Sequence, residues 1–480
     1  MRLTIVNQTG STILYYPLPS ESLSADLQIA LSPASSTTTD LQKHCSKLAL
    51  QPREQLKHDE HNVPATAESR MKRDGADPFH VHVKVLGKAR SWELVQPEED
   101  ACPWNLYRVR ISRKHDKLVI LPRRNMACFL SDIPDETMIS SLLLPGTHET
   151  MAFYGWPISQ CQTAEEANPL LNQLNSGIRA VDIRLSIIDD KLMCYHGIYP
   201  QRTPFTSILA TLHEFLSASS PGNRETVVVS IKQEDTASSF FTDLVRQEII
   251  ASEGGHDLWY TESNRIPTLG EVRGKCVLLS RYGDPSGPNL GIHPDRWPDS
   301  QKNGFVCMCG DSVVRVHDWY NITSFLSIPE KVDLAFSVLL PPDSTNTQPG
   351  SSVPIPVPGP SSLSIGFFSA ASIPLALPPA IARGFGWPQW GLGVVGVNER
   401  VGGRLLTAFS GPPSELREAA RVKSRLFRKG AETAVEKQPL RERQQEELRL
   451  RGWAFIDFLD DPVGKDIVSL LVECNFRQQG

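Results

Sequence analysis

Two histidines and an arginine stand at or near the ends of apolar stretches that read as β-strands. His148 follows "LLLPGT", Arg184 lies in "VDIRL", and His196 ends "KLMCYH". One imidazole can remove a proton from a hydroxyl, the other can protonate a departing oxygen, and a guanidinium can balance charge on a phosphoryl group. Imidazoles titrate near neutral pH, and the arginine fork fits two phosphate oxygens at once. The set therefore predicts acid–base attack at phosphorus.

Other charged or polar residues lie at further strand ends. These candidates are Glu149, Asp182, Lys232, Arg281, Asp318, Tyr320 and Asp457. Taken singly, a histidine at a strand end is more often structural, and an Asp-x-Arg pair is commonly a salt bridge. Asp182 and Arg184, however, are two positions apart on one strand and so share a face. In a parallel barrel the carboxyl ends of all strands meet at one mouth, which would bring these residues into one site.

The elements that must position them begin near residue 131. Short apolar runs there alternate with amphipathic stretches, such as the strand-like segment 225–233 after the helix-like segment 205–219. Strand and helix in alternation are typical of a parallel sheet covered by helices. We therefore predict an α/β fold, a distorted (β/α)8-type TIM barrel preceded by a small N-terminal β domain. The segment 332–340, "VDLAFSVLL", is predicted to be one of its strands.

The chain divides by pattern into two predicted domains. Residues 1–130 contain alternating strands and form a β-rich domain of unknown role, with a long polar loop over 35–75. Residues 131–480 form the catalytic barrel, interrupted by a Pro/Ser-rich loop (341–363) and a charge-dense helical insertion (412–451). We interpret the insertion as a solvated helix, with a partner-binding surface as the alternative.

Composition excludes several classes of protein. The net charge is −5 and the pI near 6.2, so a nucleic-acid partner has no support. Asn7, Gln8 and Thr9 interrupt the apolar core that a secretory signal would need, which predicts a cytoplasmic protein, peripheral to membranes. The nine cysteines have no metal-binding spacing and are expected to be buried thiols. The charge-free run 351–382 is too rich in proline for a membrane helix. We expect a monomer.

At this point five segments together resemble a known family. In chain order they are "LLLPGTHET", "GIRAVDIRL", "KLMCYHG", "ETVVVSIKQE" and "VHDWY". They resemble the X domain of phosphatidylinositol-specific phospholipase C, in its bacterial-type, calcium-independent, single-barrel branch. The resemblance covers roughly residues 131–476, and the overall layout is similar to that of fungal PLC-like phosphodiesterases. It does not explain the N-terminal domain.

The resemblance implies a role for each candidate residue. His148 is similar to the general base that deprotonates the inositol 2-hydroxyl, and His196 to the general acid that protonates the diacylglycerol oxygen. Asp457 is similar to the carboxylate that orients the base, Asp182 to the one that assists the acid and the attacking hydroxyl, and Arg184 to the phosphate-stabilising arginine. The residues assigned to substrate binding are Glu149, Lys232, Arg281, Asp318 and Tyr320, the last as a ring that stacks on the sugar. Bacterial members carry Asp where this chain has Glu149.

The same resemblance bears on metals and membranes. Arg184 and Lys232 stand where the calcium-dependent branch has ligands, so we predict no metal and no cofactor. The predicted partner is a phosphoinositide-type lipid, with transient contact to a membrane surface and Trp156, Trp297, Trp387 and Trp390 as candidate anchors. Two alternatives remain: a catalytically silent barrel that binds lipid or phosphosugar head groups, and a metal-dependent glycerophosphodiesterase barrel. The latter would need carboxylates where Arg184 and Lys232 stand.

Overall fold

The structure is a computed structural model of the 480-residue chain. The residues that it describes are 2–17, 27–33, 49–50, 55–58, 79–83, 91–95, 97, 100–112, 115–163, 167–234, 240–283, 290–341, 362–372, 374, 376–387, 392–410, 450–458 and 462–477.

Two compact units make up the chain, and the first is built from strands. It contains Met1–Arg124 and a second segment that begins at Gly402. One sheet has the order β5 (Gln55–His58), β1 (Arg2–Asn7), β9 (His115–Pro122), β8 (Trp104–Ser112) and β7 (Trp92–Val95). The other has the order β4 (Ala49–Leu50), β2 (Ile13–Pro17), β3 (Leu27–Pro33) and β6 (Phe79–Val83). Every residue of β1 from Leu3 to Asn7 is buried, so both faces of this strand are covered.

The predicted N-terminal β domain is therefore confirmed as a β-sheet structure, with one error inside it. The segment 35–75 is predicted to be a loop, but it contains β4 and β5, which pair with β2 and β1. These two short strands were not predicted because the segment is mostly polar and lacks a steady period. Both lie at the edge of a sheet, where polar residues are common.

The second unit, Asn125–Val401 with Arg449–Gly480, is the predicted α/β barrel. Its sheet has eleven strands, of which eight run parallel to a neighbour in the described residues. These are β10 (Leu143–Thr147), β11 (Ala180–Ile188), β14 (Thr226–Gln233), β15 (Trp259–Tyr260), β16 (Lys275–Arg281), β18 (Ser312–His317), β19 (Leu363–Phe367) and β22 (Gly452–Ile456). The first of them, β10, pairs with the last, β22, so the chain order runs around a ring as in a TIM barrel.

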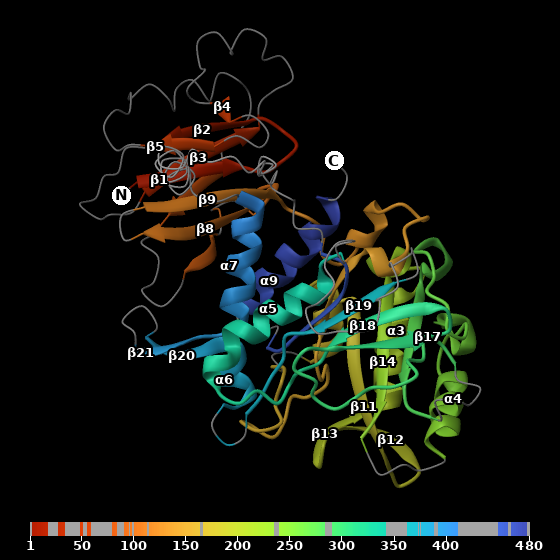
Figure 1. The fold of residues 1–480 in the computed structure, drawn as a ribbon. Coiled ribbons are helices and arrows are strands. Elements are labelled where there is room, and N and C mark those ends of the chain that lie inside the picture. The colour runs from red at the N-terminus through yellow and green to blue at the C-terminus, as the bar shows by residue number, and fades with distance from the viewer. Residues whose placement is uncertain are drawn as a thin grey trace, which may run out of the picture. The chain divides into compact units, whose positions relative to one another are not determined.

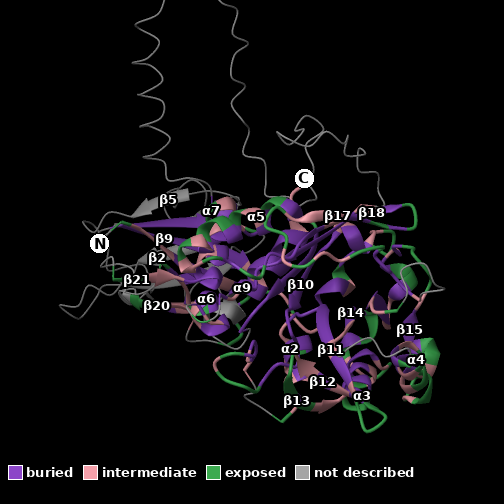
Figure 2. Cartoon of the chain, turned by 60° about the horizontal axis from the view of Figure 1, so that its bottom comes forward, coloured by how far each residue is buried: buried purple, intermediate pink, exposed green. Residues whose placement is uncertain are grey.

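Helices cover the outside of this sheet (Figure 1). They are α2 (Pro169–Asn175), α3 (Phe205–Leu216), α4 (Phe241–Ala251), α5 (Ile328–Leu339), α6 (Pro378–Arg383) and α9 (Pro462–Glu473). Helix α7 (Val397–Ser410) begins in this unit, and its residues from Gly402 onward belong to the first. Helix α5 packs against β18 and β19, and α9 against β10. Helix α3 buries Ile208, Leu209, Leu212 and Phe215, the spacing of one apolar helix face. Figure 2 shows the strands β10, β11 and β14 buried within the unit.

An irregular segment fills the ring between β16 and β18. The amide of Ile292 donates to Leu278 O of β16, and the amide of Asp295 donates to Met308 O of β17 (Phe305–Cys309), which pairs with β18. Residues 291–295 thus connect the two sides where a regular strand would lie. This is the distortion of the barrel.

Two secondary-structure predictions need correction. The segment 332–340 is not a strand but part of helix α5, whose buried Val332, Ala335, Phe336 and Leu339 repeat at helical spacing. Strand β12 (Lys191–His196) is not a barrel strand, because it runs antiparallel to β11 and forms a hairpin with β13 (Tyr199–Pro204). Strand β17 is likewise antiparallel to its neighbour.

Several predictions fall partly or wholly outside the described residues. These are most of the Pro/Ser-rich loop 341–363 and all but the end of the charged insertion 412–451. The predicted domain boundary at residue 130 lies near Arg124, although contacts group the segment from Gly402 with the first unit. Seven of the eight described cysteines are buried, and all eight are free thiols. Among the helices of the described residues, none has both the length and the apolar character needed to cross a bilayer.

Candidate active site

Three cationic side chains form a row across the carboxyl ends of the barrel strands. Arg184 of β11 is the register partner of Lys232 of β14, and Lys232 is the partner of Arg281 of β16. Parallel pairing of strands therefore brings together residues that are far apart in sequence. Three neighbouring cations repel one another, so the surrounding carboxylates are required to hold them in place.

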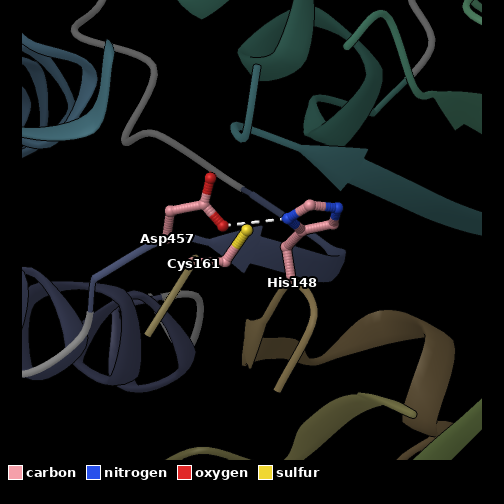
Figure 3. Close-up of side chains that lie close together, drawn as sticks. All are labelled: His148, Cys161 and Asp457. Carbon is pink, nitrogen blue, oxygen red and sulfur yellow. Dashed lines mark hydrogen bonds and ion pairs between the residues drawn. The ribbon is translucent and has the colours of Figure 1, made fainter. Parts of the chain in front are cut away.

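His148 follows β10 and is held between a carboxylate and a guanidinium. Its Nδ1 lies 2.9 Å from Asp457 Oδ1, just after β22 (Figure 3). Its Nε2 lies 2.9 Å from a guanidinium nitrogen of Arg184. A guanidinium can only donate, so Nε2 is the acceptor and Nδ1 carries the ring proton that it donates to Asp457. Burial lowers the pKa of His148, but the charge and hydrogen bond of Asp457 outweigh this and leave the pKa raised. The lone pair of Nε2 is thus the basic position.

Arg184 is surrounded by carboxylates on its other sides. Its guanidinium contacts Glu149 Oε1 at 2.5 Å, Asp182 Oδ2 at 3.1 Å and Glu234 Oε1 at 3.2 Å. Burial opposes the charge of Asp182, but Arg184 and Arg281 outweigh it and hold the pKa of this carboxyl well below its usual value. Burial likewise lowers the pKa of Arg184, and the carboxylates more than offset it. Arg184 is therefore a fixed positive charge beside the base histidine.

His196 reaches the same place from the hairpin rather than from a barrel strand. Its Nδ1 lies 2.7 Å from Ser159 O, so this nitrogen carries a proton and donates it to the carbonyl. Its Nε2 lies 3.6 Å from Glu149 Oε1. The rings of His148 and His196 are 6.4 Å apart between centroids and nearly perpendicular. This spacing lets both rings reach oxygens of a single phosphate.

Glu149 and Asp182 lie behind the reactive groups rather than in the cavity wall. Glu149 is buried, adopts a positive φ of 44° and contacts both Arg184 and His196. Asp182 is fully buried and accepts from Ser230, Arg184 and Arg281. The structure thus brings both residues to the site but turns them toward its cations.

A cavity of about 370 Å³ opens over these groups, which is within the size range of small-molecule sites. The predicted residues that line it are His148, Arg184, His196, Lys232, Arg281, Asp318, Tyr320 and Asp457. Eight of the ten predicted site residues therefore share one cavity.

A second part of the cavity lining is built around Trp297. Its indole Nε1 donates to Asp318 Oδ2 at 2.9 Å, and the guanidinium of Arg281 lies 3.9 Å from its ring centroid. Tyr320 is 40% exposed at the rim, and its hydroxyl donates to Asp299 Oδ1 at 2.6 Å. Burial and Asp299 raise the pKa of Tyr320 to about 12, so it is a neutral donor at physiological pH.

Three other residues of this cavity that contact the predicted ones were not predicted as site residues. Glu234 directly follows β14 and pairs with Lys232 Nζ at 2.7 Å, and its place at a strand end was a usable signal. Trp297 was assigned only as a candidate membrane anchor. Cys161 lies in an irregular segment with no signal at all, and burial raises the pKa of its thiol well above the usual value.

The fold and this site define an α/β barrel whose mouth holds two imidazoles and a guanidinium on one cavity. Residues 156–282 match the family model of the phosphatidylinositol-specific phospholipase C, X domain. This match confirms the predicted resemblance to that family over residues 156–282. The matched segment contains Asp182, Arg184, His196, Lys232 and Arg281.

Curated relatives carry the same assignment. The chain is 33% identical over 160 residues to the 1-phosphatidylinositol phosphodiesterase of Listeria monocytogenes, covering 32% of this chain and 48% of that protein. It is 26% identical over 201 residues to the enzyme of that name from Staphylococcus aureus, covering 40% of this chain and 64% of that protein. The chain thus spans about half to two thirds of the length of these relatives. A solved mutant of the Staphylococcus aureus phospholipase C aligns with 72% of this chain and 98% of its own, at 19% identity and a TM-score of 0.48.

Proposed function

We propose that this chain is a phosphodiesterase of the phosphatidylinositol-specific phospholipase C type. The 2-hydroxyl of inositol attacks the phosphorus, the bond from phosphorus to the diacylglycerol oxygen breaks, and a 1,2-cyclic inositol phosphate and diacylglycerol leave. The observation that carries the proposal is the placement of His148 and His196 on one cavity, with Arg184 in hydrogen-bond contact with the first. The names of the bacterial relatives support the choice of substrate class.

In this scheme His148 is the general base. The carboxylate of Asp457 fixes the tautomer in which Nε2 has a free lone pair, and it stabilises the imidazolium that forms when Nε2 accepts the proton of the 2-hydroxyl. Arg184 now donates to Nε2, so substrate binding must turn this guanidinium toward the phosphate oxygens.

His196 is the general acid. Its protonated Nε2 delivers a proton to the diacylglycerol oxygen, and Glu149 at 3.6 Å stabilises the imidazolium before transfer. Glu149 therefore replaces the shorter Asp of bacterial members as a positioning carboxylate. Arg184 and Lys232 supply positive charge to the phosphoryl oxygens, which is the task that a metal ion performs in calcium-dependent enzymes.

The part of the cavity lining around Trp297 suits an inositol ring. Asp318, Arg281 and Lys232 offer an acceptor and donors to its hydroxyls, and the exposed ring of Tyr320 can stack on a sugar face.

The rim beside the histidines suits a membrane surface. Trp156 is 62% exposed and Ile198 85% exposed, and both are close in sequence to the cavity residues Ile158 and Gly197. Aromatic and aliphatic side chains at such a rim favour the bilayer boundary, so we infer transient interfacial contact. Trp297 lies in the cavity wall and does not serve this purpose, whereas the side chains of Trp387 and Trp390 lie outside the described residues.

The test is release of cyclic inositol phosphate from labelled phosphatidylinositol vesicles in the presence of a chelator. Wild type should form the cyclic product, and His148→Ala should form none above background. His213→Ala is the matched control, because His213 lies on helix α3 away from the cavity and pairs with Glu253.

Each other outcome would contradict part of the scheme. A wild-type protein that binds the vesicles but makes no product would favour the silent head-group-binding barrel. Turnover that appears only after calcium is added would overturn the role given to Arg184. Equal product from wild type and His148→Ala would remove His148 as the base.

A further inference from the structure

Three side chains of different chemistry converge on one side of the His148 ring. Figure 3 shows the sulfur of Cys161 beside the hydrogen bond between His148 Nδ1 and Asp457 Oδ1. The three potential ligand atoms lie within 4.8 Å of one another, and all three residues line the cavity. Neither the proposed reaction nor the family resemblance uses Cys161.

The backbone holds this group together. The carbonyl of Cys161 accepts from the amide of Phe458 at 2.7 Å, next to Asp457. The side chain of the following residue, Gln162, donates to the carbonyls of His148 and Ile456. Three segments far apart in sequence are thus tied at one point, so the cluster is a fixed arrangement of the barrel mouth.

The donor set suits a divalent transition metal. Sulfur, imidazole nitrogen and carboxylate oxygen are the ligands that zinc takes in proteins, and a tetrahedral zinc ion holds such atoms ~3.3–3.6 Å apart. Closing the cluster on an ion requires shifts of ~1 Å. A thiolate and a carboxylate together carry two negative charges, which balance the ion, and all three residues line the cavity, from which water can supply a fourth ligand. His196 is not a member of the cluster, although its Nδ1 lies 3.9 Å from the sulfur of Cys161 and 2.7 Å from Ser159 O.

We propose that His148, Cys161 and Asp457 form an inhibitory site for a divalent transition-metal ion such as Zn²⁺. An ion on Nδ1 displaces the ring proton to Nε2, and sulfur releases its own proton on coordination. Nε2 then has no lone pair with which to accept the proton of the substrate hydroxyl. It also points an N–H at Arg184, which is itself a donor 2.9 Å away.

This site differs from a catalytic metal site because the ion would bind Nδ1 of His148, whereas the substrate hydroxyl is expected at Nε2. Arg184 contacts Nε2, on the substrate side, and the cluster lies on the Nδ1 side. Arg184 can therefore serve the phosphate in the metal-free protein, while the ion acts from behind the base. The proposed inhibition of catalysis by the ion rests on the proposed function. The proposed binding of the ion to His148, Cys161 and Asp457 does not.

Binding is tested with Co²⁺ alone as the probe, in protein stripped of metal by a chelator that is then removed. A thiolate bound to cobalt gives a charge-transfer band in the near ultraviolet. We expect this band, at one ion per chain, in wild type and in Cys194→Ser, and we expect Cys161→Ser to lack it. Cys194 is a matched control because it is also a buried free cysteine.

The effect on activity is tested with Zn²⁺ and phosphatidylinositol vesicles. Wild type and Cys194→Ser should lose activity and regain it with chelator, and Cys161→Ser should need at least tenfold more zinc for half inhibition. Thermal unfolding checks that the variants fold, and Cys161→Ala is the second variant if the serine form does not.

Two results would overturn the proposed binding of the metal ion. One is wild-type protein without the cobalt band, and the other is a band of equal strength in both Cys161 variants. A protein without phospholipase activity but with a Cys161-dependent band would refute the proposed function and leave the metal site standing. Zinc inhibition that Cys161→Ser does not change would locate the inhibitory ion elsewhere.

Discussion

Replacing Asp457 with asparagine removes the charge that His148 Nδ1 faces while keeping the shape of the side chain. Asp457 is 3% exposed and accepts from Nδ1 at 2.9 Å, so this is a buried, charge-assisted hydrogen bond. Such a bond contributes ~1.5–3 kcal/mol, and its loss should lower kcat/KM by ~10- to ~150-fold. An asparagine that turns its NH₂ group toward Nδ1 would also move the ring proton to Nε2 and add to the loss.

The same variant should shift the pH dependence. Burial lowers the pKa of His148 and Asp457 raises it, so without the carboxylate the pKa falls. A general base works in its deprotonated form, so activity rises with pH through this pKa. The acidic limb of kcat/KM should therefore move ~1–2 pH units toward lower pH in Asp457→Asn, even though the plateau is lower.

The assay is release of cyclic inositol phosphate from pH 4 to 9 in chelator, a range of ~5 pH units around the ordinary histidine pKa. Asp135→Asn is the control, because Asp135 pairs with Arg273 and does not line the cavity. It should keep the wild-type rate and acidic limb. If Asp457→Asn keeps its rate within threefold and its limb stays in place, Asp457 does not orient the base, and the assignment of the Nδ1 proton fails.

Three further predictions follow from the same contacts. Arg184→Lys should lower kcat/KM by ~100-fold or more, because a lysine ammonium cannot bind two phosphate oxygens in the bidentate manner of a guanidinium. Steady-state kinetics should show this loss while binding to vesicles is unchanged, and a near-normal kcat/KM would contradict the prediction. Glu225→Gln leaves Arg179 buried without its carboxylate, so urea unfolding should show a loss of ~3–5 kcal/mol with kcat unchanged, and a stable variant would refute the structural role of the pair. Burial lowers the pKa of Lys331 to about 7, so the folded protein loses this proton before the unfolded chain does, and the free energy of unfolding rises with pH between about 7 and 10.5. Lys331→Met should remove this rise, which is at most ~1.4 kcal/mol per pH unit, in urea titrations at several pH values; an unchanged slope would show that Lys331 is not the cause.

Much of the candidate site was predictable because, in a parallel barrel, strands that follow one another in the chain also lie side by side. A residue that ends a barrel strand must lie at the mouth, so Arg184, Lys232 and Arg281 fall into one row from the pairing of their strands. Asp457 ends the last strand, which pairs with the first and so returns to His148. No distance was needed for these predictions, only the period of the strands and the topology.

The failures come from segments where local pattern and tertiary pairing disagree. The run 332–340 is rich in apolar residues and reads as a strand, but its burial follows a helical period in α5. His196 was placed correctly at the site for an incorrect reason, because β12 is a hairpin strand. Antiparallel and parallel strands have the same side-chain alternation, so sequence pattern does not separate them.

By itself, the sequence determined which reactive groups exist and which strand ends present them, since both depend on residue type and on short-range periodicity. Only the tertiary structure decided their partners: which nitrogen of His148 carries the proton, that Glu149 faces His196, and that Cys161 and Trp297 enter the cavity. Hydrogen bonds and ion pairs act over a few ångströms, and the one between His148 and Asp457 joins residues 309 positions apart. Such contacts are properties of the folded chain.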